Sequence, residues 1–413
     1  MTQATLLGQI LDHANRADPY PLYTELRKTP VYREEDTNTY VVSNYWEIKG
    51  LLHDPRISSD ARNLSPQAAG ALPDQEEDES ALPPTFLKLD PPEHDRLRRM
   101  TMRPFGPPET PRRVHNMRGE LSKIVSDLID DFGDREQIDL VDNFSYPFPV
   151  TVICRLLGIP REDEARFHTW ADTIAASLDP DPSEDPTERR RIAQTARTDL
   201  GVYLAGLIDE RRKAPGDDML SALATEHGPD GQMSQMEVLS TAALLLIAGH
   251  ETTVNLITNG MLTLLRNPDV LKRLRTEPQL AVPLVEELLR FEPPVQLLPQ
   301  RTTLADIEVA GTTIPKGASL WLVLASGNRD PQRFLDPDRF DPDRKDNQHL
   351  GLGSGIHNCF GAPLARLEAQ IALTELARRL DNPRLLEDPP PYRQNAVLRG
   401  PRHLNIAFDG CRP

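Results

Sequence analysis

A glycine-rich stretch around one cysteine constrains this chain more than any other segment. It reads GSGIHNCFG from Gly353 to Gly361, and a helix-like run follows from Pro363. Glycine tolerates positive φ and lets the backbone approach a flat ligand, where a Cβ atom would collide. Unpaired N–H groups and the helix dipole favour the thiolate of a cysteine, here Cys359, that lies just before a helix. Although a lone cysteine is more commonly a small buried hydrophobic residue, this pattern favours a soft thiolate ligand to iron.

The other two cysteines give no sign of a disulfide framework, because the three are few and widely separated. Cys154 ends the apolar run VTVIC, so we expect it to be inert core. Cys411 lies two residues from the end, and we expect it to be exposed.

Charge and hydropathy exclude several classes of protein. The 413 residues carry 47 basic and 63 acidic side chains, and the net charge of −16 argues against nucleic-acid binding, which needs a basic field. Residues 1–12 lack the basic and apolar regions of a signal peptide. The longest apolar run, residues 242–248, is far below the ~18–20 residues that span a membrane. We expect a cytoplasmic, monomeric protein with no membrane anchor.

The chain shows no linker, repeat or low-complexity tract that would divide it, and its 39 prolines are scattered. We therefore expect one unit over residues 1–413, mainly α with a small β part. Helices should dominate about 90–300 and 355–385, including 162–177, 187–213 and a long buried helix over 236–265. Sheet-forming parts are expected near 30–60, 300–330 and 395–410, with strands at 31–32, 39–43, 307–309, 313–314, 319–324 and 405–408. Residues 62–84, which include an acidic tract at 74–79, should form a surface loop.

The predicted long helix contains the sequence AGHETT over residues 248–253. An acid and a hydroxyl, Glu251 and Thr252, are costly in a buried apolar helix unless they have a use. The plain alternative is that Thr252 hydrogen-bonds to a carbonyl one turn earlier. His250 and Glu251 begin the zinc-protease pattern H-E-x-x-H, but position 254 is valine, so zinc is excluded.

A charged pair, Glu287 and Arg290, lies three residues apart in the sequence EELLR. On a helix the two side chains share one face. On the surface such a pair contributes less than about 1 kcal/mol, whereas removing one partner of a buried pair costs roughly 3–5 kcal/mol.

These segments, in this order, resemble the cytochrome P-450 family of haem-thiolate monooxygenases, and the resemblance covers nearly the whole chain from His94 onward. The cysteine loop is similar to the family pattern FGxGxHxCxG but has Leu352 in place of the phenylalanine, which keeps the position apolar and loses the ring contacts. The resemblance implies the P-450 fold, with haem b between the long helix and the helix after Cys359. Cys359 would ligate the iron, with Leu352, Gly353 and Gly361 beside the cofactor.

The resemblance also implies roles for the other motifs. In the family's AGxxT motif, Gly249 would open a groove for dioxygen, Thr252 would hydrogen-bond the reduced dioxygen, and Glu251 would relay protons from solvent. Glu287 and Arg290 would form the buried ExxR pair, with Arg339 as a third member of their network. Cations would hold the haem propionates, and the candidates in matching positions are His94, Arg98, Arg301 and His357.

A family member of this type would take electrons from NAD(P)H through a ferredoxin and a ferredoxin reductase. A basic cluster could dock the acidic donor, although a solvated face is the usual role of such a run: Arg98, Arg99, Arg103, Arg112, Arg113 and Arg366. The substrate would be a hydrophobic small molecule, a natural product or steroid-like compound, in a pocket that includes Leu244, Ala248, Val295, Leu297, Val397 and Leu398. Further contacts would come from residues 62–86, 294–298 and 396–398, the start of the long helix, and the helices beside a lid at 179–186.

Two alternatives remain open. A peroxygenase that uses hydrogen peroxide could have the same fold, but it would not need Glu251 and Thr252. A haem-binding sensor or carrier without catalysis would not need them either.

Overall fold

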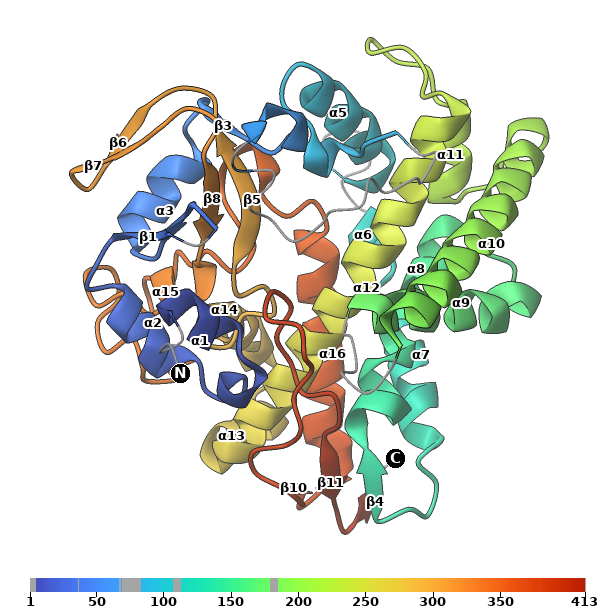
Figure 1. Ribbon diagram of the computed structural model, residues 1–413. Coiled ribbons are helices and arrows are strands. Elements are labelled where there is room, and N and C mark those ends of the chain that lie inside the picture. Colours follow the sequence, from blue (N-terminus) through green and yellow to red (C-terminus); the bar gives the residue numbers. More distant parts are fainter. Residues whose placement is uncertain are drawn as a thin grey trace.

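Helices dominate the computed structural model, in which residues 5–35, 37–66, 68, 83–106, 113–178 and 185–412 are described (Figure 1). This confirms the predicted mainly α fold. The α-helices are α1 (Leu6–Leu11), α2 (Tyr20–Leu26), α3 (Tyr45–Leu52), α5 (Glu93–Phe105), α6 (Arg113–Asn116), α7 (Arg118–Asp130), α8 (Pro147–Leu157), α9 (Glu164–Leu178), α10 (Pro186–Lys213), α11 (Met219–Thr225), α12 (Gln235–Arg266), α13 (Pro268–Thr276), α14 (Ala281–Phe291), α15 (Leu324–Gly327) and α16 (Ala362–Arg379).

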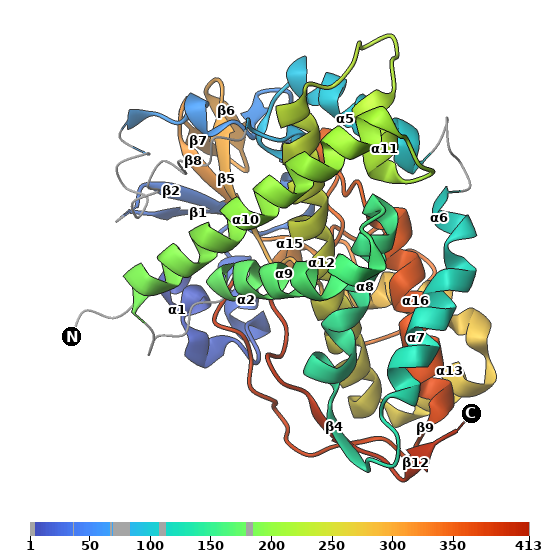
Figure 2. The ribbon, with the colours of Figure 1, turned by 90° about the vertical axis from the view of Figure 1, so that its right-hand side faces the viewer.

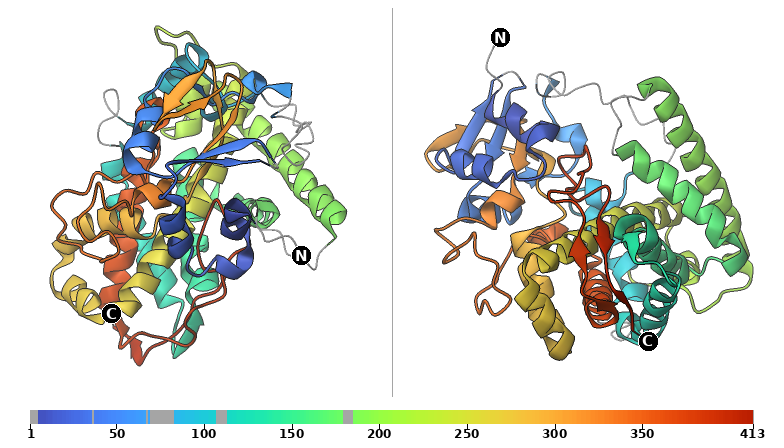
Figure 3. Two further views of the ribbon diagram at one scale, coloured as in Figure 1. Left: turned by 60° about the vertical axis from the view of Figure 1, so that its left-hand side comes forward. Right: turned by 90° about the horizontal axis from the view of Figure 1, so that it is seen from below.

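The strands are short and belong to small sheets. Their bounds are β1 (Val31–Glu34), β2 (Thr39–Val42), β3 (Ile57–Ser58), β4 (Gln137–Asp139), β5 (Leu298–Thr303), β6 (Ile307–Val309), β7 (Thr312–Ile314), β8 (Ser319–Leu322), β9 (Leu380–Asp381), β10 (Arg384–Leu385), β11 (Asn405–Ala407) and β12 (Gly410–Cys411). The largest sheet has the order β1-β2-β8-β5-β3, in which β2 and β8 are parallel and place Val41 opposite Trp321. It joins the predicted sheet-forming parts near 30–60 and 300–330. Figure 3 shows this sheet with the N-terminal helices at one side of the molecule and helices α8–α10 at the other.

The central element is α12, whose 32 residues confirm the predicted long buried helix. It begins with a capping box: Ser234 Oγ accepts a hydrogen bond from the Glu237 N–H, and the Glu237 carboxylate accepts one from the Ser234 N–H. Every residue from 253 to 264 is buried. Helices α8, α9, α10 and α16 pack around α12, and Figure 2 shows α10 crossing it. No helix in the described part of the chain combines the length and the apolar character that crossing a bilayer requires.

Helices α9 and α10 confirm the two helices predicted on either side of a break. Asp185 caps α10 by accepting a hydrogen bond from the Thr187 N–H, and Pro186 occupies the first turn. Most of the break itself, residues 179–184, lies outside the described residues, as does the acidic tract at 74–79.

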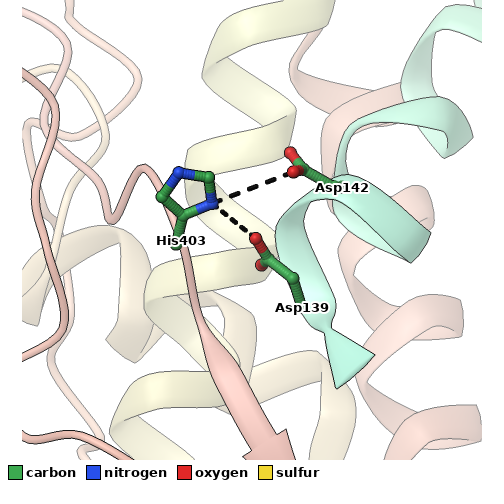
Figure 4. Close-up of side chains that lie close together, drawn as sticks. All are labelled: Asp139, Asp142 and His403. Atoms are coloured by element: carbon green, nitrogen blue, oxygen red, sulfur yellow. Dashed lines mark hydrogen bonds and ion pairs between the residues drawn. The ribbon is translucent and has the colours of Figure 1, made fainter. Parts of the chain in front are cut away.

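The C-terminal strand β11 was predicted, but its partner β4 was not. Ile406 lies opposite Ile138 in this antiparallel pair. Figure 4 shows the polar contacts at one end of the β4–β11 pair. There His403 pairs with Asp139 and lies 3.8 Å from Asp142. Asp139 also accepts hydrogen bonds from two backbone N–H groups, and Asp142 pairs with Arg402. The contacts of these three side chains therefore link the residue segment just before β11 to the end of β4 and the turn that follows it.

The cysteines outside the glycine-rich loop differ from each other in environment. Cys154 is fully buried in α8, as expected, and burial raises its pKa to about 12. Cys411 was expected to be exposed, and this was wrong. It is half-buried, because β12 pairs with β9 and brings its side chain against the main core.

Candidate active site

Backbone geometry holds Cys359 in a tight loop directly before α16. The Cys359 N–H donates a hydrogen bond to the Leu352 carbonyl at 2.8 Å. Gly353 and Gly355 have φ values of 68° and 70°, in the left-handed region that favours glycine. A Cβ atom on Gly355 would also lie 2.0 Å from the Leu52 carbonyl oxygen. The glycines therefore allow both the turn of the loop and its close approach to α3.

Opposing influences act on the Cys359 thiol. Burial raises its pKa, whereas the backbone N–H groups of Gly361 and Ala362 and the guanidinium groups of Arg98 and Arg366 lower it. The net direction is upward, so the protein groups alone do not produce the thiolate that the helix N-terminus favours. A metal cation bound to the sulfur would deprotonate it.

A cavity lies between the Cys359 loop and α12. The loop side is lined by Leu352, Gly353, His357, Cys359 and Gly361, and the α12 side by Leu244, Leu245, Ala248, Gly249, Thr252, Thr253 and Leu256. Most other lining residues are apolar: Leu52, Phe86, Leu87, Phe105, Ile153, Leu156, Leu289, Pro294, Val295, Leu298 and Leu324. Thus residues far apart in the sequence enclose a mainly hydrophobic space that has a thiol in one wall.

The residues of the AGHETT segment differ in whether they line the cavity. Gly249 and Thr252 line the cavity, and the Thr252 hydroxyl donates a hydrogen bond to the Ala248 carbonyl at 2.7 Å, the bond to the preceding turn that the plain alternative expects. Glu251 does not line the cavity. It is 4% exposed and pairs with the equally buried Arg393 at 3.1 Å. Glu251 and Thr252 are adjacent in sequence, but their side chains have different surroundings. The Thr252 side chain faces the cavity, whereas the Glu251 carboxylate pairs with Arg393 of the C-terminal segment.

Two arginines and two histidines gather at one end of the cavity. Arg98, Arg301 and His357 line it, and the ring of His94 packs against that of His357 with centroids 4.4 Å apart, although His94 is not among the lining residues. Among the described residues, neither arginine has an ion-pair partner, and His94 Nε2 and both His357 ring nitrogens are buried without hydrogen-bond partners. Burial, followed by His94, Arg301 and Arg98, lowers the pKa of His357 to about 3. This end of the cavity therefore suits a ligand that carries negative charge.

Three of the six predicted pocket residues line the cavity, namely Leu244, Ala248 and Val295. The other three, Leu297, Val397 and Leu398, are not among its lining residues. Leu297 and Val397 belong to a separate hydrophobic cluster with the N-terminal helices, and Leu398 is bridged to Val295 through its backbone.

The Glu287–Arg290 pair is fully buried, with hydrogen bonds of 2.8 and 2.7 Å from the guanidinium group to the carboxylate. Arg290 also donates to the carbonyls of Asn328, Pro337 and Arg339. Arg339 was expected to be the third member of this network, but its side chain is exposed and it contributes only this carbonyl. The third charged side chain is Arg344, which lies 3.3 Å from the Glu287 carboxylate.

Most of the described arginines of the predicted docking cluster have acidic partners. Arg99 pairs with Asp230, Arg113 with Asp217 and Arg366 with Glu286, whereas Arg98 turns toward the cavity and donates to Asn358. Arg112 lies outside the described residues.

Several residues at the site carry no signal in the sequence. Arg393 reaches Glu251 from a remote loop, and Phe86, Phe105 and Phe360 form an aromatic group beside Cys359, with Phe105 and Phe360 centroids 4.5 Å apart. Glu368 could have been noticed as an acid four residues after Leu364 and four before Ala372, on an otherwise apolar face of α16. It is buried and lines the cavity.

Comparisons with known proteins agree on one family. The Cytochrome P-450 family profile matches residues 4–408. Cytochrome P-450 monooxygenase PikC of Streptomyces venezuelae is 41% identical over 403 residues, which are 95% of this chain and 91% of PikC. Vitamin D(3) 25-hydroxylase of Pseudonocardia autotrophica is 37% identical over 95% of this chain and 94% of its own. The crystal structure of Mycobacterium smegmatis CYP164A2 has a TM-score of 0.85 and 40% identity, with 98% of this chain and 99% of that one covered.

The chain therefore belongs to the cytochrome P-450 family and is a monooxygenase related to the bacterial members. The family implies haem iron and dioxygen, and the residues of the cavity fit haem. A sulfur ligand suits the iron, apolar walls suit a flat ring, and the cationic end suits two propionates.

Proposed function

We propose that this enzyme inserts one oxygen atom into a C–H or C=C bond of a hydrophobic small molecule, a natural product or steroid-like compound. The observation that carries this proposal is the apolar wall of the cavity, which includes Leu87, Leu244 and Val295. Two relatives support the substrate class by their names, Vitamin D(3) 25-hydroxylase and 6-deoxyerythronolide B hydroxylase. A solved relative, Bacillus megaterium CYP109E1, was crystallised with corticosterone.

In this proposal Cys359 would supply the sulfur ligand to haem iron, with Leu352, Gly353 and Gly361 beside the cofactor. Arg98, Arg301 and His357 would hold the propionates, and the ring of His94 packs against that of His357. Haem, when bound, supplies the reductive activation of dioxygen, which no side chain can perform.

The chain's own task beside the haem is to position substrate, exclude water and move protons. The apolar walls exclude bulk water, which strengthens every polar interaction inside. Thr252 lines the cavity, where its hydroxyl oxygen can accept a hydrogen bond while its proton is donated to the Ala248 carbonyl, and Gly249 leaves room beside it. Glu251 relays protons from solvent toward Thr252, and the ion pair with Arg393 fixes the position of its carboxylate. The buried Glu287–Arg290 pair stabilises the fold around the cysteine loop.

We further propose that electrons come from NAD(P)H through a ferredoxin reductase and a ferredoxin. The ferredoxin would dock near Arg99, Arg103, Arg113 and Arg366, on a cytoplasmic monomer that acts as one unit over residues 1–413. The main hydrophobic core supports this unity, since it contains residues from Phe86 to Phe408.

The first test is the absorption spectrum of the dithionite-reduced enzyme under carbon monoxide. We expect a strongly red-shifted Soret band, and we expect Cys359→Ser to lose it. An unchanged spectrum and haem content in Cys359→Ser would overturn the ligand assignment.

A second test addresses the substrate. Hydrophobic candidates such as corticosterone and vitamin D3 are screened for a spin-state shift, and the products are then analysed with ferredoxin, reductase and NAD(P)H. Faster turnover with hydrogen peroxide than with the reductase system would favour a peroxygenase, and no substrate-dependent NAD(P)H consumption would favour a sensor.

A further inference from the structure

Three phenylalanine rings from separate segments form an aromatic cluster beside the cysteine loop, and one of them directly follows the cysteine. The ring centroid of Phe360 lies 4.5 Å from that of Phe105, at the end of α5, and 5.9 Å from that of Phe86. Aromatic pairs attract each other at such distances. All three rings line the cavity and are only 2–8% exposed. The cluster therefore joins the cysteine loop to α5.

Helix α5 holds both sequence neighbours of Cys359. On one side, Arg98 donates hydrogen bonds of 2.8 and 2.7 Å to the backbone and side-chain oxygens of Asn358. On the other side, the Phe360 ring packs against Phe105 of the same helix. A residue whose two neighbours are anchored by packing and hydrogen bonds has little freedom to shift. This arrangement therefore fixes the position of the Cys359 sulfur.

Position 352 lies beside this attachment in the folded loop. The Leu352 carbonyl accepts the Cys359 N–H, and the side chains of Leu352 and Phe360 both line the cavity. Leu352 packs against the same hydrophobic core that contains the three rings. The loop thus has a ring one residue after the cysteine, and an aliphatic side chain where the pattern FGxGxHxCxG has a ring.

Packing explains why the two positions depend on each other. Close-packed interiors tolerate exchanges that conserve the total volume, whereas an added ring overpacks and a lost ring leaves a cavity. A second ring at position 352 would add volume beside the cluster that already contains Phe360. With leucine at both positions, the Phe105 ring would lose its partner at 4.5 Å.

We propose that Phe360 is a positioning residue for the Cys359 sulfur, and that its ring takes the place of the aromatic side chain that the loop lacks at position 352. Ring and leucine have changed places between the two positions, which act as one unit. This inference rests on the proposed function, because it takes Cys359 as the iron ligand. The Phe360 ring acts through the sulfur and takes no part in the chemistry itself.

The consequence concerns the reduction of the iron. The reduction potential of haem iron depends on its axial ligand and on the packing and polarity around that ligand. Without the Phe360 ring, the loop loses one of its two attachments to α5, so the sulfur is held less firmly. We therefore expect loss of this ring to change the reduction potential and to speed the loss of haem.

The first experiment is a double-mutant cycle on the haem-loaded enzyme with Leu352→Phe, Phe360→Leu and the swapped double variant. The haem reduction potential and the rate at which apomyoglobin removes the haem are measured for each protein. We expect each single change to shift the reduction equilibrium by about three-fold or more and to speed haem loss by about five-fold or more. The swapped variant, which restores the total side-chain volume, should return to within about two-fold of the wild type in both quantities.

Two outcomes of this cycle would overturn the proposal. One is a swapped variant in which the effects of the two single changes simply multiply, because positions 352 and 360 would then be independent. The other is a Phe360→Leu variant with the reduction potential and haem-loss rate of the wild type.

A matched control separates positioning from a general loss of stability. Phe334 is 2% exposed, its ring centroid lies 5.7 Å from that of Tyr45, and it is not among the residues that line the cavity. Phe334→Leu removes the same atoms as Phe360→Leu, so it should lower the urea midpoint and leave the reduction potential unchanged. An equal shift of the potential in both variants would show a merely structural role and overturn the proposal.

Phe105→Leu tests the attachment from the α5 side and leaves the loop sequence intact. It should shift the reduction equilibrium in the same direction as Phe360→Leu, and the two changes together should have little more effect than one of them. Independent effects of these two changes would overturn the proposal. If Phe360→Leu does not retain haem, Phe105→Leu replaces it in the cycle with Leu352→Phe under the same criteria.

The reduced carbon monoxide spectrum of the wild type keeps this inference apart from the proposed function. A wild type without the red-shifted Soret band would contradict Cys359 as the ligand, and this inference with it. A wild type with that band, together with independent effects at positions 352 and 360, would contradict only the positioning role of Phe360.

Discussion

Leu352 is the position at which the cysteine loop departs from the family pattern FGxGxHxCxG, and its surroundings explain what an aromatic ring would do there. It lines the cavity, its carbonyl accepts the Cys359 N–H, and Phe86, Phe105 and Phe360 already lie nearby. We expect Leu352→Phe to overpack the loop, with a loss of about 1–3 kcal/mol in unfolding free energy or a shift in haem reduction potential.

Urea unfolding and a redox titration measure these two effects of Leu352→Phe. Leu335→Phe is the matched control, because Leu335 is 85% exposed and the same change should alter neither quantity. If Leu352→Phe also changed neither, the loop would tolerate a ring there.

The buried pair Glu287–Arg290 gives a second prediction for single residues. Both side chains are 0% exposed, so Glu287→Gln leaves the charges of Arg290 and Arg344 without their counter-ion. We expect a loss of roughly 3–5 kcal/mol in unfolding free energy. The exposed helical pair Lys123–Asp127 serves as control, where Asp127→Asn should cost less than about 1 kcal/mol. Similar losses in both variants would contradict the role of burial.

The candidate site could be predicted where one short segment holds the residues together. Cys359 and the AGHETT segment have fixed spacings that the sequence displays directly. Arg393 and Arg344 could not be predicted, because each reaches its acidic partner from a distant segment. Sequence spacing carries no information about such partners until the chain is folded.

At the scale of elements, helix contacts explain where glycine is needed. Gly260 on α12 has no room for a methyl group, because a Cβ would lie 2.9 Å from Leu373 and 3.0 Å from Leu288, both fully buried. We expect Gly260→Ala to destabilise the enzyme by about 1–2 kcal/mol through overpacking. Gly206→Ala on α10 meets nothing within 4 Å and should stabilise by about 0.5–1 kcal/mol. Thermal unfolding measures the change in stability of each variant. A change of the same sign in both variants would contradict this account.

The helices were easier to predict than the strands. Helix α12 displays its apolar pattern over 32 residues, and α10 has clear start signals at Asp185 and Pro186. Strand β3 has two residues, which carry no periodicity. Strand β5 contains Pro299 and the polar sequence QRTT, so only its pairing with β8 and β3 reveals it as a strand.

At the scale of the whole molecule, the two ends of the chain are tied together. Arg399, which is 1% exposed, pairs with Glu292 and donates hydrogen bonds to the carbonyls of Arg16 and Ala17. The Tyr20 hydroxyl donates to the Phe291 carbonyl at 2.8 Å. The C-terminal segment therefore joins the N-terminal helices to the end of α14.

We accordingly expect the apoprotein to unfold in one cooperative step. Three tryptophans report on different regions: Trp46 on α3, Trp170 on α9 and Trp321 on β8. Variants that keep one tryptophan each should show the same denaturant midpoint by fluorescence, equal to the midpoint from circular dichroism. A separate midpoint for Trp170 would show that the helical part unfolds independently of the sheet.

Stability in acid should depend on the contact between α14 and α16. Burial alone raises the pKa of Glu286, but hydrogen bonds from Arg366 and His349 outweigh it and lower the pKa from 4.5 to about 2. The folded enzyme thus binds this proton more weakly than the unfolded chain does. The stabilisation from Glu286 is therefore fully present above pH 4.5 and is lost as the pH falls toward 2.

Glu286→Gln should consequently lower stability at pH 7 and flatten the decline of unfolding free energy between about pH 4.5 and pH 2. The measurement is urea unfolding across this range, with Glu375→Gln as the control. Glu375 pairs with Arg378 on its own helix, so it does not join α14 to α16. If Glu286→Gln kept the wild-type slope, the link between these helices would not set the acid stability of the enzyme.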